Sequence, residues 1–309
     1  MKDSISPNDR YGCRDLLLTE TSNKKSKELD LLNTSQLVEL FSQEDLEPQK
    51  AVRKSLPQII NAIDNIILRL NTGGRLFYLG AGTSGRLGVL DASECPPTFC
   101  TPPDLVQGII AGGDSALKSS SEELEDSEQL SIDDLKSSFF SNKDCLVGIT
   151  AGGTTNYVKS ALSYAKKLGA LNISISCVPL EQVSLLSDID IRILTGPELL
   201  TGSTRLKAGT ATKMVLNMIS TIVMIRLGKV FGNKMIDLSV SNTKLRDRAL
   251  RILREEADIS IEDSIKLLDL SNGSVKVALL MAITSVDIDE AKDLLKRNNQ
   301  NLRAAIRDS

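Results

Sequence analysis

The chain contains no histidine and no tryptophan among its 309 residues. Histidine is the side chain that ordinarily exchanges protons near neutral pH. Acid–base chemistry here must therefore use a carboxylate, lysine, cysteine or tyrosine whose pKa its surroundings have shifted. Aromatic residues make up only 3% of the chain, which leaves little surface for stacking nucleic-acid bases. The net charge of −3 also lacks the basic excess typical of nucleic-acid-binding proteins.

Cysteine is sparse as well, and the five residues are Cys13, Cys95, Cys100, Cys145 and Cys177. Their number is odd, and their spacings match neither a disulfide framework nor a zinc site, so we expect reduced thiols and no bound metal. The N-terminus lacks the apolar core of a secretory signal, and no run of about 18 apolar residues is evident. These absences predict a cytoplasmic protein without a membrane span.

What is present is the composition of an ordinary globular protein, with 41% hydrophobic and 25% charged residues. The first 25 or so residues are polar and are expected to be loosely held. A helical pattern follows over residues 33–70, with Thr34 or Ser35 as the candidate N-cap. We predict three parts: an N-terminal tail with helices (1–64), an α/β ligand-binding domain (65–231) and a C-terminal helical region (232–309).

Five short apolar runs dominate the middle of the chain, and helical periodicity lies between them. The runs cover residues 76–79, 106–111, 145–150, 172–177 and 189–194. Such alternation predicts a parallel five-stranded sheet with helices on both faces. Ligands of these α/β sheets bind beyond the carboxyl ends of the strands. Glycine-rich loops at 80–85, 112–113 and 152–153 are expected at that edge.

The remainder of the chain is predicted to be helical. A long apolar-periodic helix is expected over 204–225, after Gly202. From 247 to 306 the pattern is helical throughout, with turns near Asp258, 271–273 and Asp287. This part is expected to form a small helical domain.

The loop Gly80-Ala-Gly-Thr-Ser-Gly85 joins the first predicted strand to a helix. A helix N-terminus with glycines beside it favours phosphate, and Thr83 and Ser84 add hydroxyl donors. The loop is not a Walker motif. It fits the short GxGxxG pattern, but the acidic residue that dinucleotide sites carry after the second strand is absent. The loop 152–155 (Gly-Gly-Thr-Thr) is of the same kind, and two such loops side by side suit a phosphomonoester on a sugar.

Two carboxylates are the candidates for acid–base chemistry, because paired carboxyl groups can hold different protonation states in one pocket. Glu94 precedes Cys95-Pro-Pro97, and it could equally be a surface acid at the end of a helix. Glu125 lies in an acidic run that locally reads as a solvated helix face. In the segment 201–213, the hydroxyls could cap a helix or bind an anion, and Lys207 could pair with phosphate or with acids.

Four segments resemble the N-acetylmuramic acid 6-phosphate etherase family, namely 74–99, 111–114, 196–220 and 228–245. The likeness extends from about Leu18, in Leu-Thr-Glu-Thr-Ser-Asn, to Ala305. It implies a sugar-isomerase (SIS) domain, an α/β fold with a flavodoxin-like parallel sheet and helices on both faces. It also implies a homodimer whose active sites include residues of both subunits. The implied reaction cleaves the lactyl ether of N-acetylmuramate 6-phosphate, a small sugar phosphate, and it needs no cofactor.

The resemblance also assigns roles to residues. It implies that Glu94 is the proton donor and that Glu125 is the second catalytic carboxylate. An acid must stay partly protonated near neutrality, so we expect Glu94 to be buried. Where the family usually carries Ser-Gly-Arg-Thr, this chain has Gly152 to Thr155, and Asn156 replaces a proline. The predicted phosphate- and substrate-binding residues are Gly82, Thr83, Ser84, Gly85, Gly153, Thr154, Thr155, Ser203 and Lys207.

Two other functions use the same fold. An aldose–ketose isomerase would need a similar base and phosphate loop but would release no lactate. A non-enzymatic sugar-phosphate regulator, like the related glucokinase regulatory protein, would bind without turnover, but that protein has two SIS domains and this chain has room for one.

Overall fold

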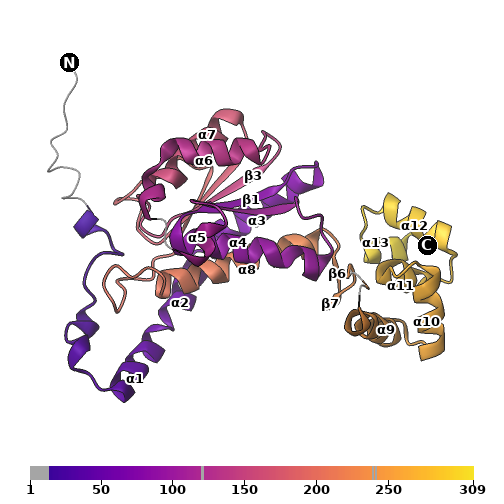
Figure 1. Ribbon diagram of the computed structural model, residues 1–309. Helices are drawn as coiled ribbons and strands as arrows, with labels where there is room; N and C mark the ends of the chain where they lie inside the picture. Colours follow the sequence, from indigo (N-terminus) through magenta and orange to yellow (C-terminus); the bar gives the residue numbers. More distant parts are fainter. Residues whose placement is uncertain (1–13, 120–121, 239, 241) are drawn as a thin grey trace. The chain divides into compact units, whose positions relative to one another are not determined.

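The computed structural model describes residues 14–119, 122–238, 240 and 242–309 (Figure 1). The chain forms two compact units. Unit 1 comprises the described residues up to Ala92 together with Val106–Ile219, and unit 2 comprises Ser93–Leu105 and Ser220–Ser309. The chain passes between the units at three points: two fall inside helices, after Ala92 and after Ile219, and the third falls between Leu105 and Val106, where a strand begins. The three-part division predicted from the sequence, with boundaries after residues 64 and 231, stays a prediction.

Unit 1 is built on a parallel five-stranded sheet with the strand order β2-β1-β3-β4-β5. This confirms the predicted α/β fold. Adjacent strands are in register at their ends, so that Gly80 lies opposite both Ile110 and Ile149. The order reverses between β1 and β3, which makes that point the topological switch point where such sheets bind ligands. The strands are β1 (Leu76–Gly80), β2 (Val106–Ile110), β3 (Cys145–Ile149), β4 (Leu171–Ser176) and β5 (Ile189–Arg192).

Helices cover both faces of the sheet, as is usual for a sheet of parallel strands. Side chains of one face, such as Phe77 and Leu146, share a buried cluster with residues of α7 (Asn156–Leu168). On the other face, a β-carbon placed on Gly88 of α4 (Gly82–Phe99) would lie 2.9 Å from Tyr78 Cβ. Figure 1 shows α6 (Glu128–Ser137) and α7 on one side of the sheet, and α4 on the other.

Gly85 allows α4 to approach the end of β1 closely. A β-carbon placed there would lie 2.6 Å from Gly80 O and 2.6 Å from Ile110 Cγ1. We expect Gly85→Ala to destabilise the protein by about 2 kcal/mol, because such overpacking displaces backbone. Gly209→Ala is the matched control, since its β-carbon meets neighbours only at 3.4 and 3.5 Å, and it is expected to be neutral or stabilising. Urea unfolding of both variants measures the difference, and equal midpoints would contradict it.

The helix α8 (Lys207–Arg226) is long and apolar enough to span a membrane by length and composition, with a mean hydropathy of 1.4. The helix is not an unbroken apolar run, because it includes Lys213 and Asn217, and the predicted absence of a membrane span stays a prediction. Among the described residues, the bent pair of helices α10 (Ile261–Leu270) and α11 (Val275–Thr284) passes the same test when the two are taken together. Core helices also pass it, and 56% of the α8 window is buried inside the protein. Because Ala211, Val215 and Ile219 are fully buried, we interpret α8 as a core helix.

The described N-terminal part consists of short turns and three helices, α1 (Thr34–Glu44), α2 (Glu47–Lys54) and α3 (Leu56–Asn71). The N-cap of α1 is Asn33, whose side chain accepts from Gln36 N while Gln36 bonds back. Thr34 and Ser35 are thus inside the helix, which corrects the predicted cap by one residue. Residues 16–23, ahead of these helices, are named the N-terminal strap.

Unit 2 is helical apart from the short hairpin β6 (Val230–Phe231) and β7 (Lys234–Met235). The predicted turns are confirmed: Asp258 ends α9 in the left-handed conformation, residues 271–273 separate two helices, and Asp287 caps α12. The core of this unit surrounds α11, whose first seven residues are buried. Its helices are α9 (Thr243–Ala257), α10 (Ile261–Leu270), α11 (Val275–Thr284), α12 (Ile288–Arg297) and α13 (Leu302–Arg307).

Candidate active site

Two loops flank the switch point between β1 and β3. The first is short, because β1 ends at Gly80 and α4 begins at Gly82, which leaves Thr83 and Ser84 half-buried in the first helical turn. The second runs from Thr150 to Thr155 and leads into α7. The N-cap of α7 is Thr155, whose side chain makes no capping hydrogen bond. The first N–H groups of a helix lack intrahelical partners, and they favour an anion.

Gly153 gives the second loop its shape. Its φ of +73° lies in the left-handed region that side chains disfavour, and a β-carbon there would press against Val183 at 3.0 Å. Thr154 and Thr155 follow half-buried, and the Thr155 hydroxyl accepts a 3.1 Å hydrogen bond from Thr150. The loop therefore presents hydroxyls beside a helix N-terminus, as the predicted phosphate site requires.

Glu125 lies beside the first loop. It belongs to the 3-10 helix η5 (Glu122–Asp126), and a β-carbon placed on Gly82 would lie 3.2 Å from its Oε1 atom. The side chain is half-buried. The structure thus brings a carboxylate to the glycine-rich turn at the switch point, although locally the acidic run around it reads as a solvated face.

The segment before α8 lies against the same loop. A β-carbon placed on Gly209, in the first turn of α8, would lie 3.5 Å from Thr83 Cγ2 and 3.4 Å from Thr204 O. Ser203 lies in the turn before α8 and is half-buried. Unit 1 therefore gathers the first loop, Glu125 and the 203–209 segment at one place, and the second loop follows the adjacent strand.

The N-terminus of α8 is occupied by the protein's own carboxylate. Glu198 is buried and accepts hydrogen bonds from the backbone N–H groups of Lys207 (3.0 Å) and Ala208 (2.9 Å). Burial raises the pKa of the Glu198 carboxyl, and the two backbone donors oppose this shift in part. The α8 terminus therefore already holds a carboxyl group of the protein itself, whereas the N-cap residue of α7 makes no side-chain capping hydrogen bond.

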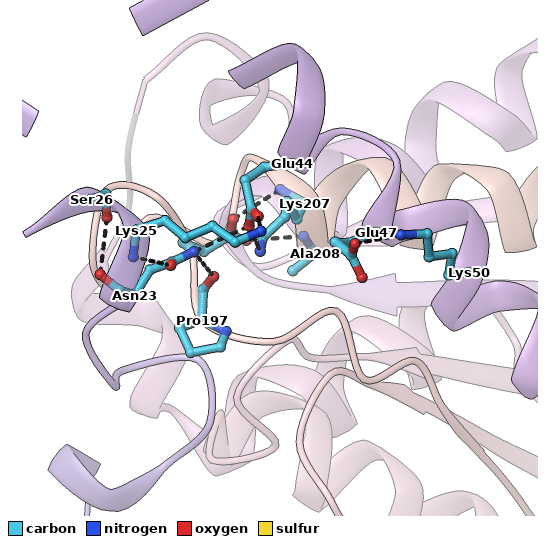
Figure 2. A network of polar contacts seen from close by, with 10 residues as sticks. Asn23, Lys25, Ser26, Glu44, Glu47, Lys50, Pro197, Lys207 and Ala208 are labelled. Carbon is cyan, nitrogen blue, oxygen red and sulfur yellow. Dashed lines mark hydrogen bonds and ion pairs between the residues drawn. The ribbon is translucent and has the colours of Figure 1, made fainter. Parts of the chain in front are cut away.

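The Lys207 ammonium is also engaged. Its Nζ atom lies 2.6 Å from Glu44 Oε2, and both side chains are only 4% exposed. Figure 2 shows two more donors that converge on the same carboxylate: Asn23, the last residue of the strap, and Lys25, just after it. Their hydrogen bonds to Glu44 are 3.1 and 2.7 Å long. Of the two roles considered for Lys207, the structure displays the pairing with an acid, and its role in phosphate binding stays a prediction.

Glu94 is placed differently from Glu125. It is the thirteenth residue of α4, about three turns beyond Gly82. The helix continues through Pro96 and Pro97 to Phe99. The Glu94 side chain is exposed, so the expectation that it is buried is wrong for this chain. Glu94 belongs to unit 2, whereas Glu125 belongs to unit 1.

The described residues contain no group of three or more acidic or cysteine side chains that could hold a metal ion. The four described cysteines, Cys95, Cys100, Cys145 and Cys177, are free thiols. Cys13 lies outside the described residues. Burial raises the pKa of Cys145 and of Cys177 to about 12, so neither is a nucleophile near neutral pH.

Three residues that the sequence analysis did not single out organise this region: Thr19, Glu44 and Glu198. The role of Glu198 could have been predicted from the sequence, because an acidic residue just before an expected helix often binds the N–H groups at that helix's N-terminus. The sequence carries no such signal for Glu44, since its partner Lys207 is 163 residues away. Thr19 stands in the Leu-Thr-Glu-Thr-Ser-Asn segment, where local pattern indicates no role.

Comparison with known proteins decides the family. An N-acetylmuramic acid 6-phosphate etherase of Prochlorococcus marinus (strain MIT 9303) is 60% identical over 303 residues, which is 98% of this chain and 95% of the relative. The chain belongs to the N-acetylmuramic acid 6-phosphate etherase family. A second etherase, from Synechococcus sp. (strain CC9902), is 58% identical over the same shares of both chains.

Family models locate the fold of this etherase-family protein. The glucokinase regulatory protein N-terminal SIS domain matches residues 58–166, and the SIS domain matches residues 131–222. Together they span the whole sheet of unit 1 and confirm the expected SIS domain. A phosphoheptose isomerase from Francisella tularensis superposes with a TM-score of 0.47 at 17% identity, over 63% of this chain and all of that chain.

Proposed function

We propose that the protein cleaves the D-lactyl ether of N-acetylmuramic acid 6-phosphate by elimination and hydration. The products are N-acetylglucosamine 6-phosphate and D-lactate, as in the catabolism of cell-wall amino sugars. Membership of the etherase family over nearly the full chain supports this substrate. The structural observation that carries the chemistry is the Glu125 carboxylate beside Gly82 at the switch-point loop.

The phosphate is proposed to bind at the open N-terminus of α7 and at the first turn of α4. Backbone N–H groups there favour an anion, and the hydroxyls of Thr83, Ser84, Thr154 and Thr155 are available around it. Such a site fixes one end of the sugar and so places its reacting carbons relative to Glu125.

The proposed reaction needs one base and one acid. The ring-opened sugar has an aldehyde at C1, which acidifies the C2 proton. A carboxylate removes that proton, the C2–C3 double bond forms, and the C3–oxygen bond breaks as the leaving lactyl oxygen is protonated. Water then adds at C3 and a proton returns to C2. We assign Glu94 to protonation of the leaving oxygen, and Glu125 to the base steps.

A homodimer is proposed to complete the site, with Glu94 of the partner subunit facing Glu125. This would bury Glu94, which its own chain leaves exposed. The surface of unit 1 supports such pairing, because large apolar side chains stay exposed on its helices. They include Val38 on α1, which is 64% exposed, and Ile60 and Leu68 on α3, which are 57% and 64% exposed. A cytoplasmic location, where amino-sugar phosphates are metabolised, belongs to the same proposal.

The test is incubation with N-acetylmuramate 6-phosphate in ¹⁸O-labelled water, with mass analysis of both products. Elimination and hydration put the label on C3 of the amino sugar and leave D-lactate unlabelled. Label in lactate alone would mean that a different bond is cut. Turnover to an isomeric sugar without lactate would favour the aldose–ketose isomerase. Saturable binding without any product would favour the regulator.

A further inference from the structure

The N-terminal strap is fixed to unit 1 at both ends. At one end the Leu18 N–H donates to Gln182 Oε1 at 2.9 Å, and Gln182 Nε2 donates to Leu16 O at 2.8 Å. At the other end Asn23 Nδ2 donates to Pro197 O at 3.1 Å. Gln182 follows β4 and Pro197 follows β5, so the strap contacts the loops at the carboxyl ends of the strands.

Thr19, in the middle of the strap, has a buried hydroxyl group without a partner. The residue is 1% exposed, and its Oγ1 atom makes no hydrogen bond. The nearby Thr21 hydroxyl, in contrast, donates to Leu18 O at 2.9 Å. Buried polar groups are almost always hydrogen-bonded, since leaving one unpaired is costly. The Thr19 hydroxyl therefore indicates a missing partner.

The Thr19 hydroxyl faces the loop between β3 and α7. A β-carbon placed on Gly152 would lie 3.6 Å from Thr19 Oγ1 and 3.7 Å from Thr154 Oγ1. Both hydroxyl oxygens thus lie within van der Waals distance of the position that a β-carbon of residue 152 would occupy. The same loop leads into the 13-residue helix α7, whose N-terminus has no side-chain cap. Hydroxyl donors beside an open helix N-terminus match the oxygens of a phosphate group.

We propose that Thr19 is a substrate-binding residue, whose hydroxyl donates to a phosphate oxygen held at the N-terminus of α7 across Gly152. Thr154, whose hydroxyl lies near the same position, donates to the same phosphate group. The strap then forms one wall of the phosphate site. The other partner is the loop 152–155, which lacks the serine and arginine that are usual in this family. The identity of the sugar rests on the proposed function, whereas the contact itself requires only a phosphate monoester.

The test compares Thr19→Val, which keeps the shape and removes the hydroxyl, with Thr19→Ser, which restores it. Thr101→Val is the matched control, because Thr101 is also buried, its hydroxyl also lacks a partner, and it belongs to unit 2. Binding of inorganic phosphate is measured by calorimetry. KM and kcat are measured from turnover of N-acetylmuramate 6-phosphate. We expect Thr19→Val to weaken phosphate binding and raise KM by about tenfold or more, with kcat unchanged. Thr19→Ser and Thr101→Val are expected to stay near the wild type.

Gly152→Ala provides a second variant that leaves Thr19 intact. Its β-carbon would meet its neighbours at 3.6 to 3.8 Å, which is ordinary contact, so the fold is expected to tolerate it. It fills the space between the hydroxyls and should weaken phosphate binding as Thr19→Val does. Unchanged phosphate affinity in both variants, or no phosphate binding by the wild type, would overturn the proposal. Thr19-dependent phosphate binding without D-lactate release would instead overturn the proposed function alone.

Discussion

Glu94→Gln is expected to lower kcat for D-lactate release by about 10²- to 10⁴-fold, with KM changed little. Glutamine keeps the size and polarity of the side chain but cannot deliver a proton to the leaving ether oxygen. Glu125→Gln is expected to cause a loss of the same order, because an amide cannot accept the C2 proton. Glu123→Gln is the matched control, since Glu123 is an exposed acid on the same 3-10 helix and should retain full activity.

Mixing the two inactive variants tests the shared site. If Glu94 of one subunit works with Glu125 of the other, a mixed dimer contains one intact site and one doubly inactive site. Random subunit exchange makes half of the dimers mixed, so activity should recover to about one quarter of the wild type. No recovery after verified exchange would place both carboxylates of a site in one subunit. Normal turnover by Glu94→Gln alone would refute the assigned proton donor.

The sheet could be predicted because its signals are local. Each strand lies in a short stretch that is rich in apolar residues, and a glycine or proline stands at its end or within a few residues after it. All five strands and the turns of unit 2 therefore follow from neighbouring residues. The sequence pattern predicts the start of α8 at residue 204, whereas the helix begins three residues later, at Lys207. The Glu198 carboxylate, which binds the backbone of Lys207 and Ala208, fixes that start, and no propensity of the helix itself reveals it.

The candidate site was predictable only in part. Glycine and hydroxyl patterns located both loops, because phosphate-binding turns carry that composition. Glu125 was singled out through the resemblance alone, since its acidic surroundings look the same as a solvated face. The proximity of Thr19 to Gly152 and the ion pair of Glu44 with Lys207 each involve residues more than a hundred positions apart. Nothing in the local pattern of either partner encodes such pairs.

Glu44→Gln is expected to be the most destabilising of the polar substitutions, at about 3 kcal/mol. The Glu44 carboxylate accepts from Lys207, Lys25 and Asn23, and so joins α1, the strap and the start of α8. Glutamine would leave the buried Lys207 ammonium without a counter-charge. Glu47→Gln is the matched control. Glu47 pairs with Lys50 (Figure 2), but the two side chains are 38% and 58% exposed, so this ion pair should contribute less than about 1 kcal/mol to stability.

The contribution of Glu44 should also depend on pH in a defined window. Burial disfavours its charged form, but the hydrogen bonds from Lys207 and Lys25 outweigh burial and lower the pKa of Glu44 from 4.5 to about 2. A carboxyl with a lowered folded-state pKa stabilises the protein fully above its unfolded pKa, and loses that stabilisation as pH falls toward the folded value. The difference in unfolding free energy between wild type and Glu44→Gln should therefore be constant above about pH 5 and shrink between about pH 4.5 and 2. Urea titrations at pH 7, 4 and 3 measure it, and a difference that stays constant down to pH 3 would show that the Glu44 charge does not hold these three segments together.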